Sequence, residues 1–182
     1  DNMRRESAKY LTPSIQWKAE LPLPMRTKLI DVLCTDAEFD ELQANRLVDM
    51  VQYARFGAGD TIVSAGEPWP YIVFVLDGAL SIDRFNLEIH EGGQLGILEF
   101  LGEERIRDSS RVSCKRDGQL AGLPFDALQS LLSSDGHLAF KLLTYLGSYA
   151  MTLVTATGRT PKSSRVVELQ QAILMRRNSA GG

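Results

Sequence analysis

Leu95-Gly96-Ile97-Leu98-Glu99-Phe100-Leu101 is the stretch that decides the fold of this chain, together with Arg107-Asp108-Ser109-Ser110-Arg111-Val112 that follows it. The first part sets one glycine before a run of mostly apolar side chains, which is typical of a turn into a packed segment. The second part carries arginines and serines, which hold anions well because guanidinium and hydroxyl groups donate hydrogen bonds. Ile97 in the first part and Asp108 in the second are the two positions on which the functional interpretation of this stretch depends.

Short apolar segments separated by turn-forming residues surround this stretch. They are typical of an antiparallel β-roll, because paired strands alternate with turns that contain glycine, aspartate or asparagine. The strand candidates are residues 51–55, 61–64, 71–76, 79–84, 87–90, 111–115 and 119–123. Turns are predicted between them, among others at Asp77-Gly78 and Asp117-Gly118.

Helices are predicted on both sides of the roll. Pro24 suits a first helical turn and starts one helix that runs to Cys34, and Asp36 is interpreted as the N-cap of a second helix. After the roll, one helix begins at Pro124 and a longer one, over 137–154, bears a continuous apolar stripe. In the second helix the apolar side is predicted to consist of Phe39, Leu42, Leu47 and Met50.

The fold class is therefore α+β: an antiparallel, jelly-roll-like β-roll flanked by N-terminal helices and two C-terminal helices. With 182 residues, one domain with terminal appendages is the default organisation. We expect an extended lead-in over 1–23 anchored by Trp17, a domain over 24–157, and a linker with a short tail helix over 158–182.

Composition and residue spacing exclude several classes of function. The formal charge of -3 and the pI near 5.5 give no positive field, so no nucleic-acid partner is expected. Cys34 and Cys114 form no metal pair, and His90 and His137 lack the spacing of a metal or nucleophile site. We therefore predict neither a metal nor enzyme activity. No apolar run approaches the roughly 18 residues of a membrane span, so the segment is expected to be cytoplasmic, with tethering through a host protein left open.

Motifs along the roll resemble those of the cyclic nucleotide-binding domain, the catabolite-activator-like β-roll family. Phe56-Gly57-Ala58-Gly59-Asp60-Thr61-Ile62 is similar to the opening turn of that family, and Tyr71 to Leu80 is similar to its strand, tight turn and next strand. The resemblance implies that Gly96 to Val112 is a phosphate-binding cassette. In this family an arginine and a small hydroxyl side chain hold the cyclic phosphate, and a glutamate accepts from the ribose 2′-hydroxyl.

Two positions depart from that cassette. Ile97 stands where the family has its glutamate, and Asp108 stands where it has its arginine. We therefore predict a degenerate site without a bound cofactor, and cAMP and cGMP are disfavoured because a carboxylate repels a phosphate. It is left open that Glu99 turns inward and replaces the missing glutamate. It is also left open that a shifted loop brings Arg107 or Arg111 to the position of the missing arginine. The candidate ligand-site residues are Gly96, Leu98, Arg107, Ser109, Ser110 and Arg111.

The leading hypothesis is a non-catalytic regulatory or interaction module that contacts the other domains of its parent protein or a partner protein. The first alternative is a functional cyclic nucleotide or anion sensor that controls a transporter, channel or kinase, and the second is a structural scaffold subunit. A homodimer through helix 137–154 is left open. Phosphorylation of Ser7 or Ser179 is also left open, since both serines follow a pair of arginines.

Three motifs point to a host protein. Leu21-Pro22-Leu23, Tyr53 to Gly59 and Gly96 to Phe100 resemble the cytoplasmic C-terminal domain of some sulfate permease family transporters. We do not expect one of the bacterial transcription factors of the family, because the residues after 155 are too few and too linker-like for a helix-turn-helix.

Overall fold

The computed structural model describes residues 15–101 and 111–157 of the chain. Helices precede and follow a block of strands, which confirms the α+β class predicted from the sequence. In chain order the elements are α2 (Leu23–Asp36), α3 (Glu41–Val48), β1 (Gln52–Phe56), β2 (Thr61–Val63), β3 (Tyr71–Ile82), the 3-10 turn η2 (Asp83–Phe85), β4 (Leu87–His90), β5 (Gln94–Leu95), α4 (Ile97–Leu101), β6 (Val112–Pro124), α5 (Phe125–Ser134) and α6 (Gly136–Thr157).

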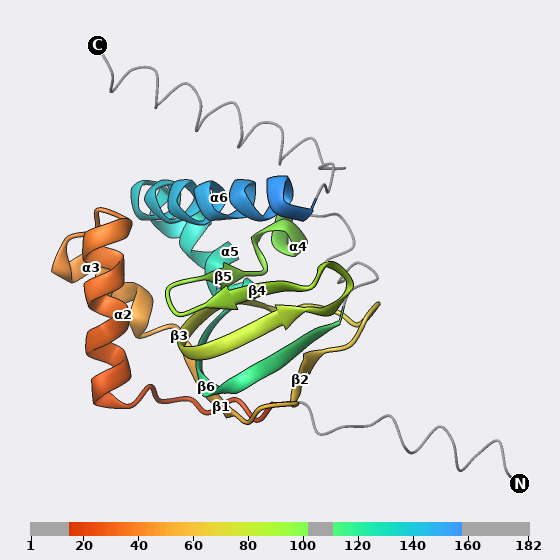
Figure 1. Cartoon of the computed structure of the whole chain (residues 1–182). Helices are drawn as coiled ribbons and strands as arrows, with labels where there is room; N and C mark the ends of the chain where they lie inside the picture. The colour runs from red at the N-terminus through yellow and green to blue at the C-terminus, as the bar shows by residue number, and fades with distance from the viewer. Residues whose placement is uncertain (1–14, 102–110, 158–182) are drawn as a thin grey trace, which may run out of the picture.

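The strands form one antiparallel sheet that curls into a roll. Its order is β1-β6-β3-β4, with β2 added on β6 and β5 added on β3. The central pair, β3 and β6, is aligned from Tyr71 opposite Pro124 to Ile82 opposite Val112. Figure 1 shows α5 and α6 across one side of the roll and α2 and α3 beside one end of it. The roll and the helices share one hydrophobic core.

The Asp77-Gly78 and Asp117-Gly118 pairs are not turns, and this part of the sequence prediction was wrong. Each pair lies inside a long strand, and the β3–β6 register shifts on both sides of Asp77. Gly78 has a φ of 86°, and a Cβ at Gly78 or Gly118 would lie closer than 3.0 Å to the backbone of the facing strand. Gly78 and Gly118 therefore lie at facing irregularities of the β3–β6 pair. Positive φ and a missing side chain suit a β-bulge as well as a tight turn.

The N-cap of the second helix was also placed wrongly. Asp36 is the last residue of α2, and α3 begins at Glu41 with Asp40 as its N-cap. The Gln43 N–H donates to Asp40 Oδ1 at 2.8 Å, and the Asp40 N–H donates to Gln43 Oε1 at 3.2 Å. This reciprocal pair satisfies two donors at the helix start. Because the helix starts later than expected, Leu42 lies on its outer side, 73% exposed, and not in the core.

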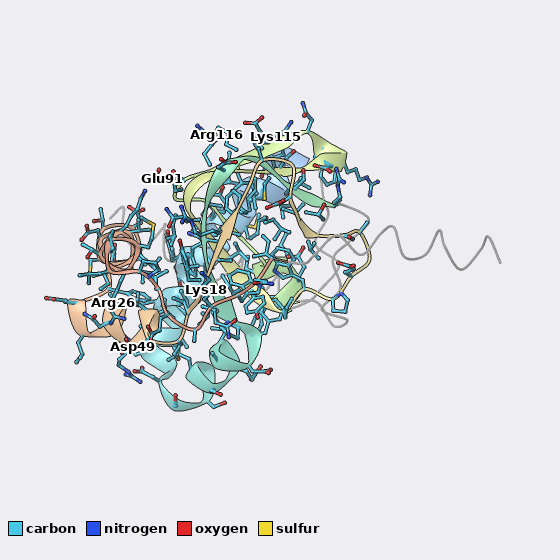
Figure 2. The ribbon with its side chains drawn as sticks, turned by 90° about the horizontal axis from the view of Figure 1, so that it is seen from below. Lys18, Arg26, Asp49, Glu91, Lys115 and Arg116 are labelled. Atoms are coloured by element: carbon cyan, nitrogen blue, oxygen red, sulfur yellow. The ribbon has the colours of Figure 1, made fainter. Side chains whose placement is uncertain are left out.

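Polar contacts join the first helices to each other and to the last ones. Arg26 of α2 and Asp49 after α3 lie side by side in Figure 2, and 2.7 Å separates Arg26 Nη2 from Asp49 Oδ1. Arg46 of α3 pairs with Asp135 at the corner between α5 and α6, with 2.6 Å between Nη1 and Oδ2. The helices at the two ends of the chain are therefore in contact.

The lead-in crosses the roll before α2 begins. Trp17 stacks on Tyr71 with 4.5 Å between ring centroids, and its ring occupies the space that a side chain at Gly122 would need. Lys18 exchanges two backbone hydrogen bonds with Tyr53 of β1, of 2.7 and 2.8 Å. Trp17 thus anchors the lead-in, as its position in the sequence predicted.

Helix α6 corrects one expectation from composition. Its stretch Gly136–Thr155 is long and apolar enough to cross a membrane by length and composition, with a mean hydropathy of 1.2. Lys141 is the one charged residue in this stretch, whereas the sequence analysis expected no apolar run of membrane-span length. In the structure the apolar stripe faces the core, where Leu138, Leu142 and Leu146 are at most 1% exposed. A core helix passes the same length and hydropathy test, so the test alone does not indicate a span.

Candidate functional site

Gly96 introduces the cassette and lies against the start of β3. Its φ is 109°, which favours glycine. A Cβ at this position would lie closer than 3.0 Å both to the carbonyl oxygen of Tyr71 and to the indole nitrogen of Trp69. The glycine is therefore required by a close approach of two backbone segments. This requirement concerns the fold and holds with or without a ligand.

Helix α4 follows directly and packs its apolar residues inward. The Phe100 N–H donates to the Gly96 carbonyl at 2.8 Å, which closes the first turn. Ile97 and Phe100 are each 5% exposed, and the ring of Phe100 contacts Phe125 edge to face, with 5.2 Å between centroids. Leu98, a predicted site residue, is half-buried and packs against the core. Ile97 is thus a core residue at the position where the resemblance implies a glutamate.

Glu99 is the acidic residue of α4, and it is only 5% exposed. A carboxylate that lies inside a protein needs hydrogen-bond or charge partners, because burial removes its hydration. The sequence analysis left open that Glu99 turns inward, and its burial agrees with that possibility. In the sequence, Glu99 is one residue after Leu98 and two residues after Ile97.

Arg111 stands at the other end of the cassette and is engaged with Asp83. Its Nε lies 2.6 Å from Asp83 Oδ2, and the Asp83 N–H donates to the Arg111 carbonyl at 3.0 Å. Ser113 Oγ donates to the other oxygen of Asp83 at 2.6 Å. Partial burial raises the pKa of Asp83, but the hydrogen bonds from Ser113 and Arg111 and the nearby positive charges lower it overall. The carboxylate is therefore held ionised beside the guanidinium.

The described site residues lie at opposite ends of β3. Gly96 contacts Tyr71 and Ile72 at the beginning of that strand, whereas Arg111 borders its end at Ile82. Gly96 and Arg111 thus border the two ends of one 12-residue strand. Arg107, Asp108, Ser109 and Ser110 lie outside the described residues, as do Ser7, Ser179 and the tail after 157.

The strand before Gly96 is covered by two tyrosines of α6, which the sequence analysis did not single out. Tyr149 approaches Gly93 so closely that a Cβ there would lie 2.5 Å from the tyrosine hydroxyl. Burial raises the pKa of Tyr145 to about 12, with a further contribution from the negative charge of Asp36, and a hydrogen bond with Gln94 acts against both. Helix α6 therefore rests on the residues that lead into the cassette. The available signal was the spacing of two aromatic residues four positions apart on one helix.

The part of the chain that the structure describes holds no group of three or more histidine, cysteine, aspartate or glutamate side chains suited to a metal ion. Cys114 is 4% exposed, and burial together with the negative charge of Asp60 raises the pKa of its thiol to about 12. A thiol with so high a pKa is a poor nucleophile at neutral pH. Among these residues, neither metal binding nor thiol chemistry is indicated.

Comparisons with solved structures identify the fold. A cyclic nucleotide-binding domain from Methylobacillus flagellatus is similar with a TM-score of 0.63 and 17% identity, and the match covers 92% of each chain. The c-di-GMP responsive global regulator CLP of Xanthomonas campestris matches with a TM-score of 0.57 and 18% identity over 66% of this chain and 62% of its own.

A regulatory subunit of a cAMP-independent protein kinase A from Trypanosoma brucei matches with a TM-score of 0.54 and 21% identity, over 69% of this chain and 47% of its own. No family model and no curated protein sequence matches the chain. The chain therefore has the fold of a cyclic nucleotide-binding domain, as the motifs along the roll predicted. At these identities the likeness concerns the fold alone, and the resemblance to sulfate permease family transporters stays a prediction.

Proposed function

We propose that this chain is a non-catalytic regulatory module that no longer binds a cyclic nucleotide and acts through contacts with its parent protein or a partner. The observation that carries the proposal is the burial of Ile97. Its side chain is 5% exposed and belongs to the hydrophobic core. A hydrocarbon side chain accepts no hydrogen bond, so the ribose hydroxyl that the family binds at this position has no acceptor there.

The electrostatics of Arg111 support the same proposal. Its guanidinium is within 2.6 Å of the Asp83 carboxylate, so its charge is largely neutralised by that neighbour. A phosphate would have to compete with a carboxylate that is already in place. The sequence adds a second carboxylate, Asp108, at the position of the family's arginine.

Two of the relatives support a regulatory role without cAMP. One is a regulator that responds to c-di-GMP and the other is a regulatory subunit of a cAMP-independent protein kinase A, so this fold also occurs in regulatory proteins not described as responding to cAMP. Both relatives extend well beyond the part that matches this chain. We therefore infer that the module belongs to a larger protein, is located in the cytoplasm, and has no catalytic activity of its own.

A nucleotide or anion sensor is the second candidate, and its possible acceptor is Glu99, which is 5% exposed and already has an interaction partner that a ligand would have to displace. A buried carboxylate in the cassette helix is the kind of acceptor that Ile97 lacks. If Glu99 accepted a hydrogen bond from a ribose hydroxyl, it would take the role of the family's glutamate, two residues after Ile97 along α4.

Calorimetric titration of the full chain with cAMP and cGMP tests the proposal. We expect no binding up to millimolar nucleotide, and micromolar affinity would overturn the proposal. In that case Glu99→Gln decides whether Glu99 is the acceptor, since the variant would lose affinity by about tenfold or more. Glu88→Gln is the matched control, because Glu88 lies on the same roll with its side chain 46% exposed.

A further inference from the structure

A small cavity lies where α2 meets the sheet, away from the cassette. Its volume is about 130 Å³. It adjoins the middle of β3, whereas Gly96 contacts the beginning of that strand. Residues of α2, of β3 and of the turn after β4 line it: Lys28, Leu29, Val32, Phe74, Val75, Leu76, Glu91 and Gly92.

The walls of the cavity are apolar and firmly held. Leu29 is 1% exposed and Phe74 is 3% exposed, so both side chains are packed from behind by the core. Closely packed side chains do not relax easily into neighbouring space. The cavity is therefore a feature of the packing between α2 and β3.

Two backbone N–H groups in the wall, those of Gly92 and Val75, are already hydrogen-bonded. The Gly92 N–H donates to the Val75 carbonyl at 2.9 Å, and the Val75 N–H donates to the Gly93 carbonyl at 2.9 Å. These groups therefore have no hydrogen bond to offer an occupant. A molecule in the cavity would be held by apolar contact, and a polar molecule would lose its hydration without replacement.

The charged residues of the cavity lie on its solvent side and neutralise each other. Lys28 Nζ and Glu91 Oε1 are 2.6 Å apart, and the two side chains are 33% and 54% exposed. Figure 2 places Glu91 on the side of the roll that faces α2. Since the ion pair carries no net charge, it attracts neither an anion nor a cation into the cavity.

We propose that this cavity binds a small, uncharged, apolar molecule of the size of a single hydrocarbon ring. Its volume of about 130 Å³ is close to the roughly 150 Å³ of an engineered apolar cavity that binds benzene or xenon, but unlike that enclosed cavity it opens to solvent beside the exposed Glu91 and Gly92. The site does not share residues with the cassette, so it goes beyond the proposed function. A bound molecule would bridge α2 to β3 and stabilise the contact between the helix and the sheet.

Titration of the full chain with benzene, followed by amide chemical shifts, tests the proposal. We expect saturable shifts centred on Val32, Val75 and Gly92, and a melting temperature that rises with benzene concentration, because a ligand of the native state stabilises it. Xenon should perturb the same residues. Absence of saturable shifts up to the solubility limit of benzene would overturn the proposal.

Two substitutions at Val32 sharpen the test. Val32→Phe fills the cavity and should weaken benzene binding by about tenfold or more, while Val32→Ala enlarges the cavity and should retain binding. Val32 is half-buried, so both changes are milder than changes at Leu29. Should the Phe variant not fold, the wild-type and Ala titrations still decide. Unchanged binding in a folded Phe variant would place the benzene elsewhere and overturn the proposal.

A charge test completes the experiment. Benzoate has the same ring with a negative charge, and we expect it to bind at least about tenfold more weakly than benzene, because its carboxylate finds no donor in the wall. Equal affinity would overturn the apolar assignment. A parallel cAMP titration reports on the cassette alone, so the two proposals can fail separately.

Discussion

The two ends of the cassette are built in different ways. At Gly96 two backbone segments approach so closely that no side chain fits, and Ile97 beside it is buried. At Arg111 the side chain is 55% exposed and is held by an ion pair with Asp83. Close backbone packing accepts one residue type, whereas an exposed ion pair accepts many. The frame of a binding site can therefore persist after its chemistry has changed.

Gly96→Ala is expected to have the largest effect. The new Cβ would clash with the Tyr71 carbonyl and would impose a φ of 109° on an alanine. We expect the free energy of unfolding to fall by about 2–5 kcal/mol, measured by urea denaturation. The control is Gly66→Ala, since Gly66 has a φ of 78° but no atom within 4 Å of the Cβ position. Its expected loss is about 1 kcal/mol, and equal losses would contradict the close-packing account.

Ile97→Glu is expected to have the next largest effect. Burial disfavours the charged carboxylate, so the pKa of the introduced glutamate should rise above its ordinary value of about 4.3. An acid with a raised folded-state pKa loses stability as the pH rises through the unfolded-state value. The loss should therefore be small near pH 4 and reach about 2–3 kcal/mol at pH 7, measured by urea denaturation at both pH values.

Ile97→Leu is the control for that variant and should cost less than about 1.5 kcal/mol, independent of pH. If the glutamate variant were as stable as the leucine variant at pH 7, this end of the cassette would still contain hydrogen-bond donors or positive charges that hold a carboxylate. That result would weaken the contrast between the two ends.

The pH dependence of the stability of Asp83→Asn tests the exposed end of the cassette, at Arg111. The hydrogen bonds and positive charges around Asp83 lower its pKa in spite of partial burial. A lowered pKa contributes stability above the unfolded value of about 3.9, and this contribution is lost as the pH falls through the folded-state value. Because the side chain is 31% exposed, we expect the wild type to exceed the variant by only about 1 kcal/mol at pH 7. A difference that stays constant down to pH 2 in urea denaturation would contradict this account.

Arg111→Ala is expected to have the smallest effect. An exposed ion pair contributes about 0–1 kcal/mol, and the difference from the wild type should vanish in 1 M salt, where the screening length is about 3 Å. Melting curves at low and high salt measure it. A loss comparable to that of Gly96→Ala would mean that the two ends are not built differently.

The architecture could be predicted wherever a local pattern has a single structural meaning. The apolar stripe over 137–154 became α6, Gly136–Thr157, because a periodicity of 3.6 residues leaves few alternatives. Gly96 was interpreted as a turn residue before a packed segment, and its close contact with the Tyr71 carbonyl oxygen explains why a glycine stands there. The inability of Ile97 to accept a hydrogen bond also followed from its side chain alone.

The errors occurred where one pattern has two meanings. Asp-Gly occurs in hairpin turns and in bulges, and at Gly78 and Gly118 the facing strand decides between them. Asp36 and Asp40 are both good N-caps by residue type, but only Asp40 has Gln43 three residues later to complete the reciprocal hydrogen bonds.

The site could be predicted only in part, because its contacts link residues far apart in the chain. Arg111 pairs with Asp83, which is 28 positions away, and no local pattern connects them. The cavity beside α2 depends in the same way on how a helix and a strand from separate parts of the sequence meet. Such contacts are properties of the packing and become visible only in three dimensions.

The central place of β6 has a consequence for synthesis of the chain. β6 pairs with β1, β2 and β3, yet it is the last of the described strands to be translated. Until Pro124 has left the ribosome, β3 can pair only with β4 and β5, and the backbone groups that β1 and β2 later share with β6 stay open. At roughly 5–20 residues per second, the nascent chain carries these open edges for on the order of seconds. Mispairing and chaperone contact are therefore expected to be concentrated in that interval.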